Sequence, residues 1–310
     1  MSRWLHCLES AKSALPGSLK TCLWMIRITV AVSFAVFLLD YFGMLDWISA
    51  LLEPMFEHFG LPGGSALAFV CGFFVNCYSA LAVGMTLGLS ARAMTILGVM
   101  VLCAHNVIVE TSVQKKTGTQ AWKMVVVRLS SAIILGFLLN FIIPSEFGLT
   151  IKSTFVATTD DAAFFVQFKS WLLSLLSLIA KMIVLIFSLN ILQRLLSDFG
   201  IIKWISKFLK PLLTVFGLPA RCSFLWIIAN VVGLAYGAAA MIEEVGRGQI
   251  NKRDIDLLNL HIGISHSNVE DLILFSLSGA VWWIMLLARW AFATLIVWTA
   301  RLLNPAPKGV

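Results

Sequence analysis

An internal repeat is the feature that most constrains how this chain can fold. When the sequence is shifted by 161 positions, His105 falls on His266 and Arg128 falls on Arg289, among other matches of uncommon residue types. Chance is a poor explanation for such a series. We therefore interpret the chain as two copies of one unit, the pattern of repeat proteins and of transporters built from related halves.

The composition places the chain in a lipid bilayer. Of its 310 residues, 59% are hydrophobic and only 13% are charged, whereas a soluble protein carries roughly 25% charged residues. The net charge of +7 comes from Lys and Arg beside apolar runs rather than from basic blocks. This distribution is typical of anchoring at the cytoplasmic surface of a membrane, so we expect no nucleic-acid partner.

Both copies show the same order of segments. A membrane-length apolar helix is expected first, then an amphipathic stretch that ends in Phe-Gly-Leu-Pro, an interrupted apolar segment, a segment with the histidine and a closing helix. In the first copy these segments are 21–42, 45–58, 63–89, 91–113 and 121–143; in the second they are 168–192, 201–215, 220–246, 255–277 and 280–303. The expected divisions are an N-terminal segment 1–20, a first repeat 21–143, a connecting loop 144–167, a second repeat 168–303 and a tail 304–310.

Charge in the amphipathic stretches predicts that the second copy is inverted. The first stretch carries carboxylates between Asp46 and Glu57, and the second carries lysines between Lys203 and Lys210. Because basic segments favour the cytoplasmic side, we expect the two stretches on opposite sides of the membrane. An odd number of crossings per copy is then required, and the interrupted apolar segments become re-entrant hairpins. An alternative with eight crossings would leave the lysine-rich stretch outside.

The resulting fold class is an all-α polytopic membrane protein with two tandem repeats in inverted topology. It has about six crossing helices, two re-entrant hairpins and two interfacial amphipathic helices. We expect it in the cell inner membrane with both termini in the cytoplasm.

Polar residues at membrane depth are the first candidates for a binding site. They are His105, Asn106 and Glu110 in the first copy, and His266, Ser267, Asn268, Glu270 and Asp271 in the second. On continuous helices, Asn106 and Glu110 project from one face, as do His266 and Glu270. Polar groups in hydrocarbon mark an ion or solute path, or else pair with one another. We expect these faces to meet near the midplane and either hydrogen-bond a polar solute or coordinate a cation.

Internal ion pairs explain the carboxylates equally well. Arg128 can reach the depth of Glu110, and Arg289 can reach that of Asp271 in the same arrangement. Each arginine needs a partner in hydrocarbon.

The hairpin tips supply a second set of candidates. These residues are Asn76, Tyr78, Ser79 and Tyr236. The alternative is that small residues here only permit close helix packing. Cys103 and His105 have metal-ligand chemistry with Cys71 or Cys77, but no sequential spacing supports a metal site. Without a Walker A motif, a nucleophile elbow or HExxH, we expect no cofactor and no enzymatic activity.

The histidine segments, His-Asn-Val-Ile-Val-Glu-Thr and His-Ser-Asn-Val-Glu-Asp, resemble the Gate, or nucleoside-recognition, domain family, and so does the repeated Phe-Gly-Leu-Pro. That family includes the gates of concentrative nucleoside transporters, the membrane domain of ferrous-iron transporter B and the spore maturation A and B proteins. The resemblance covers nearly all of residues 40–300, and it implies two tandem gates with a hairpin and a broken helix in each half. The residues to which it carries over are His105, Asn106, Glu110, His266, Ser267 and Asp271. The chain lacks a GTPase domain and the glutamine, threonine and glutamate cluster of the nucleoside carriers.

These features together predict a transporter. We expect alternating access between the two repeats for a small polar or anionic solute, nucleoside-like compounds included, with a coupling cation. The arginines favour an anion where they are not neutralised. The alternatives are a divalent-metal permease of the ferrous-iron type, and a membrane subunit or scaffold that transports nothing alone. A homo-oligomer is compatible with each of these three functions.

Overall fold

The computed structural model describes residues 3–147, 162–248 and 250–304, which form helices and no strand. Five helical segments in these ranges are long and apolar enough to cross a membrane: Leu8–Tyr41, Ala91–Lys116, Ala121–Ile142, Phe164–Asp198 and Trp282–Leu303. The chain is therefore an all-helical polytopic membrane protein, as its composition predicts.

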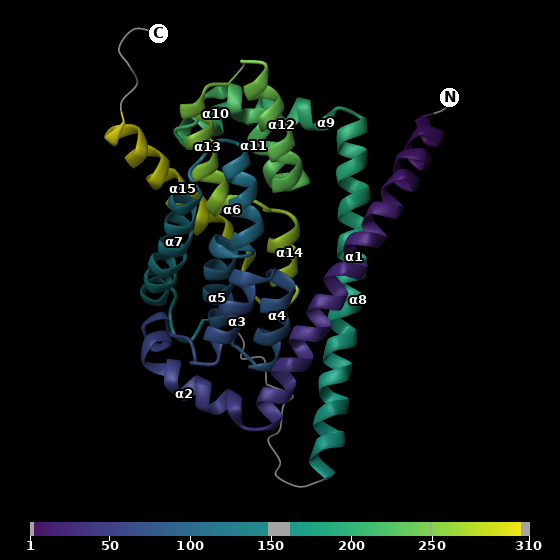
Figure 1. Cartoon of the computed structure of the whole chain (residues 1–310), viewed down its shortest axis with the longest axis vertical. Helices are drawn as coiled ribbons and strands as arrows, with labels where there is room; N and C mark the ends of the chain where they lie inside the picture. The colour runs from purple at the N-terminus through teal and green to yellow at the C-terminus, as the bar shows by residue number, and fades with distance from the viewer. Residues whose placement is uncertain (1–2, 148–161, 249, 305–310) are drawn as a thin grey trace.

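Helices α1 (Arg3–Tyr41) and α8 (Ala162–Asp198) pack against each other along one side of the molecule (Figure 1). Trp171 stacks on Phe37 with ring centroids 5.2 Å apart, and its indole N–H donates to Ser33 Oγ at 3.0 Å. Both helices are longer than predicted, since residues 3–20 and 162–167 are helical. An apolar window marks only the part of a helix that lies in hydrocarbon, whereas polar turns can continue it into water.

The amphipathic stretches are helical, as predicted, and lie at opposite ends of the molecule. The first forms α2 (Met44–Phe56) and η1 (Glu57–Phe59), and the second forms α9 (Ile201–Phe208) and α10 (Lys210–Val215). Figure 1 shows α2 at the lower end and α9 and α10 at the upper end. Trp47 is 68% exposed and Trp204 61%. Exposed tryptophans on such helices are typical of a membrane interface.

The first interrupted segment forms a pair of short helices, α3 (Ser65–Phe74) and α4 (Cys77–Thr86), which pack against each other. Each has 10 residues and is about 15 Å long, roughly half the thickness of the hydrocarbon core. Extended backbone at Asn76 separates them, and Asn76 Oδ1 caps α4 by accepting from the Ser79 amide. This geometry fits the predicted re-entrant hairpin.

The second interrupted segment has a corresponding shape at the opposite end (Figure 1). Its elements are η2 (Ala220–Cys222), α11 (Ser223–Ile227), η3 (Ile228–Val232) and α12 (Leu234–Gly246). The chain turns at Gly233, whose φ of 112° is rarely adopted by residues other than glycine. The π-helical η3 and Gly233 separate the two arms of this hairpin, as Asn76 separates α3 from α4 in the first hairpin.

The histidine segments are broken helices, in agreement with what the family resemblance implies, so the continuous helices expected from periodicity at 91–113 and 255–277 are wrong. The first consists of α5 (Ala91–Ala104) and α6 (Val107–Lys116), and the second of α13 (Lys252–Ser265) and α14 (Glu270–Ser276). Figure 1 shows α6 above α5 but α14 below α13, so the two segments run in opposite directions. Periodicity could not reveal the breaks because both flanks of each break are apolar helix.

Two closing helices complete the structure. Helix α7 (Ala121–Ile142) packs against α5, and α15 (Trp282–Leu303) packs against α13. Four of the six expected crossings are single long apolar helices, and α5 with α6 forms a fifth apolar span that is interrupted at His105. The sixth expected crossing is α13 with α14, where neither part is long enough by itself.

The opposite placement of α2 and α9 predicts opposite chemical accessibility. Glu57 and Lys207 are exposed on these two ends, so Glu57→Cys and Lys207→Cys should react with a membrane-impermeant maleimide from different sides. Labelling of intact cells and of inverted vesicles, with the unsubstituted chain as background, checks this expectation. Equal labelling of both positions from one side would contradict it.

Candidate functional site

The two helix breaks face each other inside the molecule. The rings of His105 and His266 are stacked with centroids 5.1 Å apart, and both histidines are buried. Each histidine ends its helix, because its amide still donates to the residue four positions earlier while its own backbone is extended. The next residues, Asn106 (φ 48°) and Ser267 (φ 57°), adopt the left-handed conformation. The two breaks therefore have the same backbone geometry.

Two buried arginines bind the carbonyls that the breaks leave free. Arg128 of α7 donates from Nε to the Cys103 carbonyl at 3.0 Å and from Nη2 to the His105 carbonyl at 2.6 Å. Arg289 of α15 donates to the His266 carbonyl at 3.1 Å. A carbonyl without a partner in a bilayer costs several kcal/mol, since no water can replace the lost helix bond. The matched arginines are thus the groups that make the breaks tolerable.

The carboxylates do not pair with these arginines in the same way. Glu110 Oε2 lies 2.6 Å from Arg128 Nη2, which is the predicted ion pair. The predicted pair of Asp271 with Arg289 is wrong, because Arg289 has no ion pair within the described part of the chain. Its Nη2 donates instead to Asn268 Oδ1 at 2.8 Å. Asn268 thus satisfies the guanidinium and leaves Asp271 unpaired with it.

Glu110 connects the two halves of the chain. Its two oxygens lie 3.0 Å from His105 Nε2 and 3.1 Å from His266 Nε2. Asp271 Oδ2 approaches His105 Nε2 from the other half at 3.5 Å. These four side chains form one buried cluster at the meeting point of the breaks.

The hairpins join the same cluster. Tyr78 donates its hydroxyl to Glu270 Oε1 at 2.8 Å, so the predicted placement of Glu270 with His266 on one helix face is wrong. Helix α14 begins only at Glu270, after the break. The Asn106 amide donates to the Gly72 carbonyl at 2.9 Å.

Asn230 of the second hairpin was not among the predicted residues. The Asn268 amide and side chain donate to its carbonyl and its Oδ1, at 3.2 and 2.6 Å. Its sequence signal was weak, a single amide inside an apolar run. Both hairpins therefore hold the residues that follow the breaks.

A cavity of about 230 Å³ lies at this cluster. Its polar lining comprises Asn76, Cys77, Tyr78, His105, Asn106, Glu110, His266, Ser267, Glu270 and Asp271. Among the predicted site residues, Asn268 and Ser79 lie outside this lining. Ser79 is fully buried and its amide is held by Asn76. The side chain of Tyr236 lies outside the described part of the structure.

The cluster has donor sets that could hold a metal ion. Cys77, His105 and Asp271 form one set, and His105, Glu110 and His266 form another, each with donor atoms within 4.8 Å of one another. Nitrogen, oxygen and sulfur donors together suit first-row transition metals. Sequence spacing could not indicate such a site because its donors come from separate segments of both halves. Cys77 lies in the first hairpin tip, and no spacing to another ligand in the sequence identified it as a metal donor.

Comparison with known proteins supports the assignment to membranes. The chain is 29% identical over 291 residues to the uncharacterized membrane protein YvoD of Bacillus subtilis (strain 168), covering 92% of this chain and 91% of that protein. No family model and no solved structure matches the chain. The chain is thus homologous to a bacterial membrane protein over nearly its whole length.

The role of Arg128 predicts a large loss of stability on its removal. Arg128→Met should destabilise the protein by about 3–5 kcal/mol, because Glu110 and two carbonyls would lose a buried partner. Arg194→Met is the matched control, since Arg194 is half-exposed and its ion pair within the described residues is a surface pair with Asp198, a contact with an expected contribution of roughly 0.5 kcal/mol. Unfolding in detergent measures both changes, and equal losses would contradict the assigned role.

Proposed function

We propose that the chain is a membrane transporter in which two related units, inverted relative to each other, enclose one solute site at their helix breaks. The observation that carries this proposal is the polar cavity of about 230 Å³, to which both halves contribute. A protein in a bilayer retains polar side chains at this depth at a cost, and they commonly line a solute path. The resemblance to the Gate family agrees with this architecture.

Several matched features support the inverted units. His105 and His266 end broken helices that run in opposite directions, and Arg128 and Arg289 each bind the carbonyl of the corresponding histidine. Transporters of this kind bind their solute between broken helices and alternate access by moving one unit against the other.

The contacts between the two units are the interactions that would break and re-form during transport. Glu110 of the first unit contacts His266 of the second, and Tyr78 of the first binds Glu270 of the second. A solute that took over these polar groups would weaken the direct contacts between the units. Rocking of one unit could then open the cavity to either side.

The charge of the lining favours a cation. Glu110, Glu270 and Asp271 contribute three carboxylates, and among the described residues Glu110 alone of the three is paired with an arginine. The guanidinium of Arg289 is bound by oxygen atoms of His266 and Asn268 instead. The anionic solute expected from the two arginines therefore has weaker support. A nucleoside-like solute would have to compete with the carboxylates for the same groups.

The orientation of His266 strengthens the case for a cation. Its Nδ1 lies 2.7 Å from the Ile262 carbonyl, and a carbonyl accepts only from a protonated nitrogen. On a neutral ring, Nε2 would then be an acceptor that faces Glu110 Oε2, 3.1 Å away. Two acceptors at this distance require a proton or a metal ion between them. Metal-binding histidines are commonly held by such a second hydrogen bond, so we favour a divalent metal as the solute and a proton as its coupling partner.

Charge distribution supports an orientation in the membrane. Lys203, Lys207 and Lys210 lie at the same end of the molecule as the start of α1 and the end of α15 (Figure 1). By the preference of basic residues for the cytoplasmic side, this end would face the cytoplasm and both termini with it.

The function is tested with purified full-length protein in liposomes. Uptake of Mn²⁺, Zn²⁺ and Fe²⁺ should exceed that of empty liposomes for at least one ion, and a nucleoside should not be taken up. Asp271→Asn should raise the metal concentration needed for half-maximal uptake at least about tenfold, because a charged donor is lost. Glu243→Gln is the control, since its side chain is 61% exposed and lies outside the cavity lining.

The alternative outcomes separate the candidate functions. Uptake of a nucleoside or anion without metal uptake would overturn the cation assignment. Absence of any uptake under every ion gradient would favour a membrane subunit that does not transport alone.

A further inference from the structure

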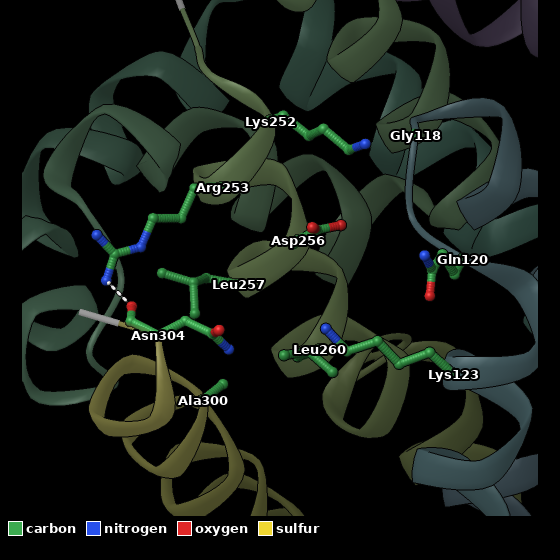
Figure 2. A pocket seen from close by; sticks show the side chains of 10 residues that line it. All are labelled: Gly118, Gln120, Lys123, Lys252, Arg253, Asp256, Leu257, Leu260, Ala300 and Asn304. Carbon is green, nitrogen blue, oxygen red and sulfur yellow. Dashed lines mark hydrogen bonds between the residues drawn. The ribbon is translucent and has the colours of Figure 1, made fainter. Parts of the chain in front are cut away.

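A second cavity, of about 410 Å³, lies apart from the central site (Figure 2). It is bordered by the turn between α6 and α7, by the start of α13 and by the end of α15. Gly118 and Lys123 come from the first half of the chain, and Lys252, Arg253 and Asn304 from the second. None of these residues belongs to the central cavity.

The positive charges around this cavity lack acidic partners. Lys123, Lys252 and Arg253 make no ion pair within the described residues. Figure 2 shows Lys123 and Lys252 reaching in from opposite rims, with Asp256 between them. Asp256, the one carboxylate of the described lining, already accepts from Thr119 Oγ1 at 2.6 Å. Three cations and one carboxylate leave a net charge of +2 around one cavity.

The lining is also suited to an amphiphilic molecule. An apolar wall lies beside the charged rim and is formed by Leu257, Leu260 and Ala300. The cavity lies toward the end of the molecule that carries α9 and α10 and their lysines (Figure 1). At a membrane surface, each Lys or Arg contributes about 1 kcal/mol of attraction toward anionic headgroups.

The two halves of the chain are also tied together beside this cavity. Asn259 Nδ2 donates to the hydroxyls of Thr117 and Thr119 at 2.7 and 2.8 Å. A ligand that contacts Lys123 and Lys252 together would add a second connection between α7 and α13 at this end.

We propose that this cavity binds a phosphate-bearing anion, with Lys123 and Lys252 as the residues that recognise the phosphate and Arg253 as a third cation at the rim. Arg253 Nη2 already donates to the Asn304 carbonyl at 2.6 Å, which fixes its position. The phosphate can belong to the headgroup of an anionic phospholipid or to a small soluble phosphate ester, because both present the same charge and acceptor atoms. This site is independent of the proposed transport function.

The test uses the full-length protein in detergent and follows its melting temperature. Dioctanoyl phosphatidylglycerol, dioctanoyl phosphatidylcholine and glycerol phosphate are titrated separately, since a ligand that binds the folded state raises the melting temperature by mass action. Phosphatidylglycerol should stabilise the protein at lower concentration than phosphatidylcholine. The double variant Lys123→Gln with Lys252→Gln should bind the anion at least about tenfold more weakly.

The matched control is Lys203→Gln with Lys207→Gln, which removes the same charge from α9 at the same end. This variant should respond to the anion as the unsubstituted chain does. Stabilisation by phosphatidylglycerol alone identifies a lipid headgroup as the source of the phosphate, and equal stabilisation by glycerol phosphate identifies a soluble ester. Loss of the response in both double variants, or no response of the unsubstituted chain to either anion, would overturn the proposal.

Discussion

The binding of backbone carbonyls by two buried arginines is the interaction on which the rest of the structure depends. Arg128 and Arg289 satisfy the carbonyls of His105 and His266, where the helices stop inside the hydrophobic interior. Without such donors the breaks would expose unpaired carbonyls to hydrocarbon, and a continuous helix would be favoured. Because the breaks exist, polar side chains from both halves can meet in one cavity.

The two halves share the same backbone geometry at their helix breaks, but different side chains bind the buried arginine in each half. In the first, Glu110 neutralises Arg128 and contacts both histidines. In the second, Asn268 accepts a hydrogen bond from the guanidinium of Arg289. Asp271 therefore does not pair with Arg289 and can bind a solute in the cavity. This difference gives the lining its excess of carboxylates. It also explains why matched arginines in the sequence need not indicate an anionic solute.

The apolar helices and the interruptions of the two hairpins could be predicted from the sequence, whereas the positions of the breaks at the two histidines could not. Hydropathy and charge were enough to predict the apolar helices, the surface helices and the opposite placement of α2 and α9. The family resemblance implied a broken helix in each half, but periodicity did not place the breaks at His105 and His266, because the left-handed conformation of Asn106 and Ser267 depends on partners far away in the sequence. For the same reason, the pairing of Tyr78 with Glu270 and the proximity of Cys77 to Asp271 could not be predicted from spacing.

The central claim is that the cavity between the helix breaks is a cation site, and the most direct test is a structure determined in the presence of Mn²⁺ with its anomalous scattering recorded. The account predicts an anomalous peak at roughly 2.0–2.4 Å from donor atoms of His105 and Asp271, with Cys77 or Glu110 completing the site. A structure at saturating Mn²⁺ in which the peak lies elsewhere, with the Glu110 contacts to His105 and His266 unchanged, would contradict it.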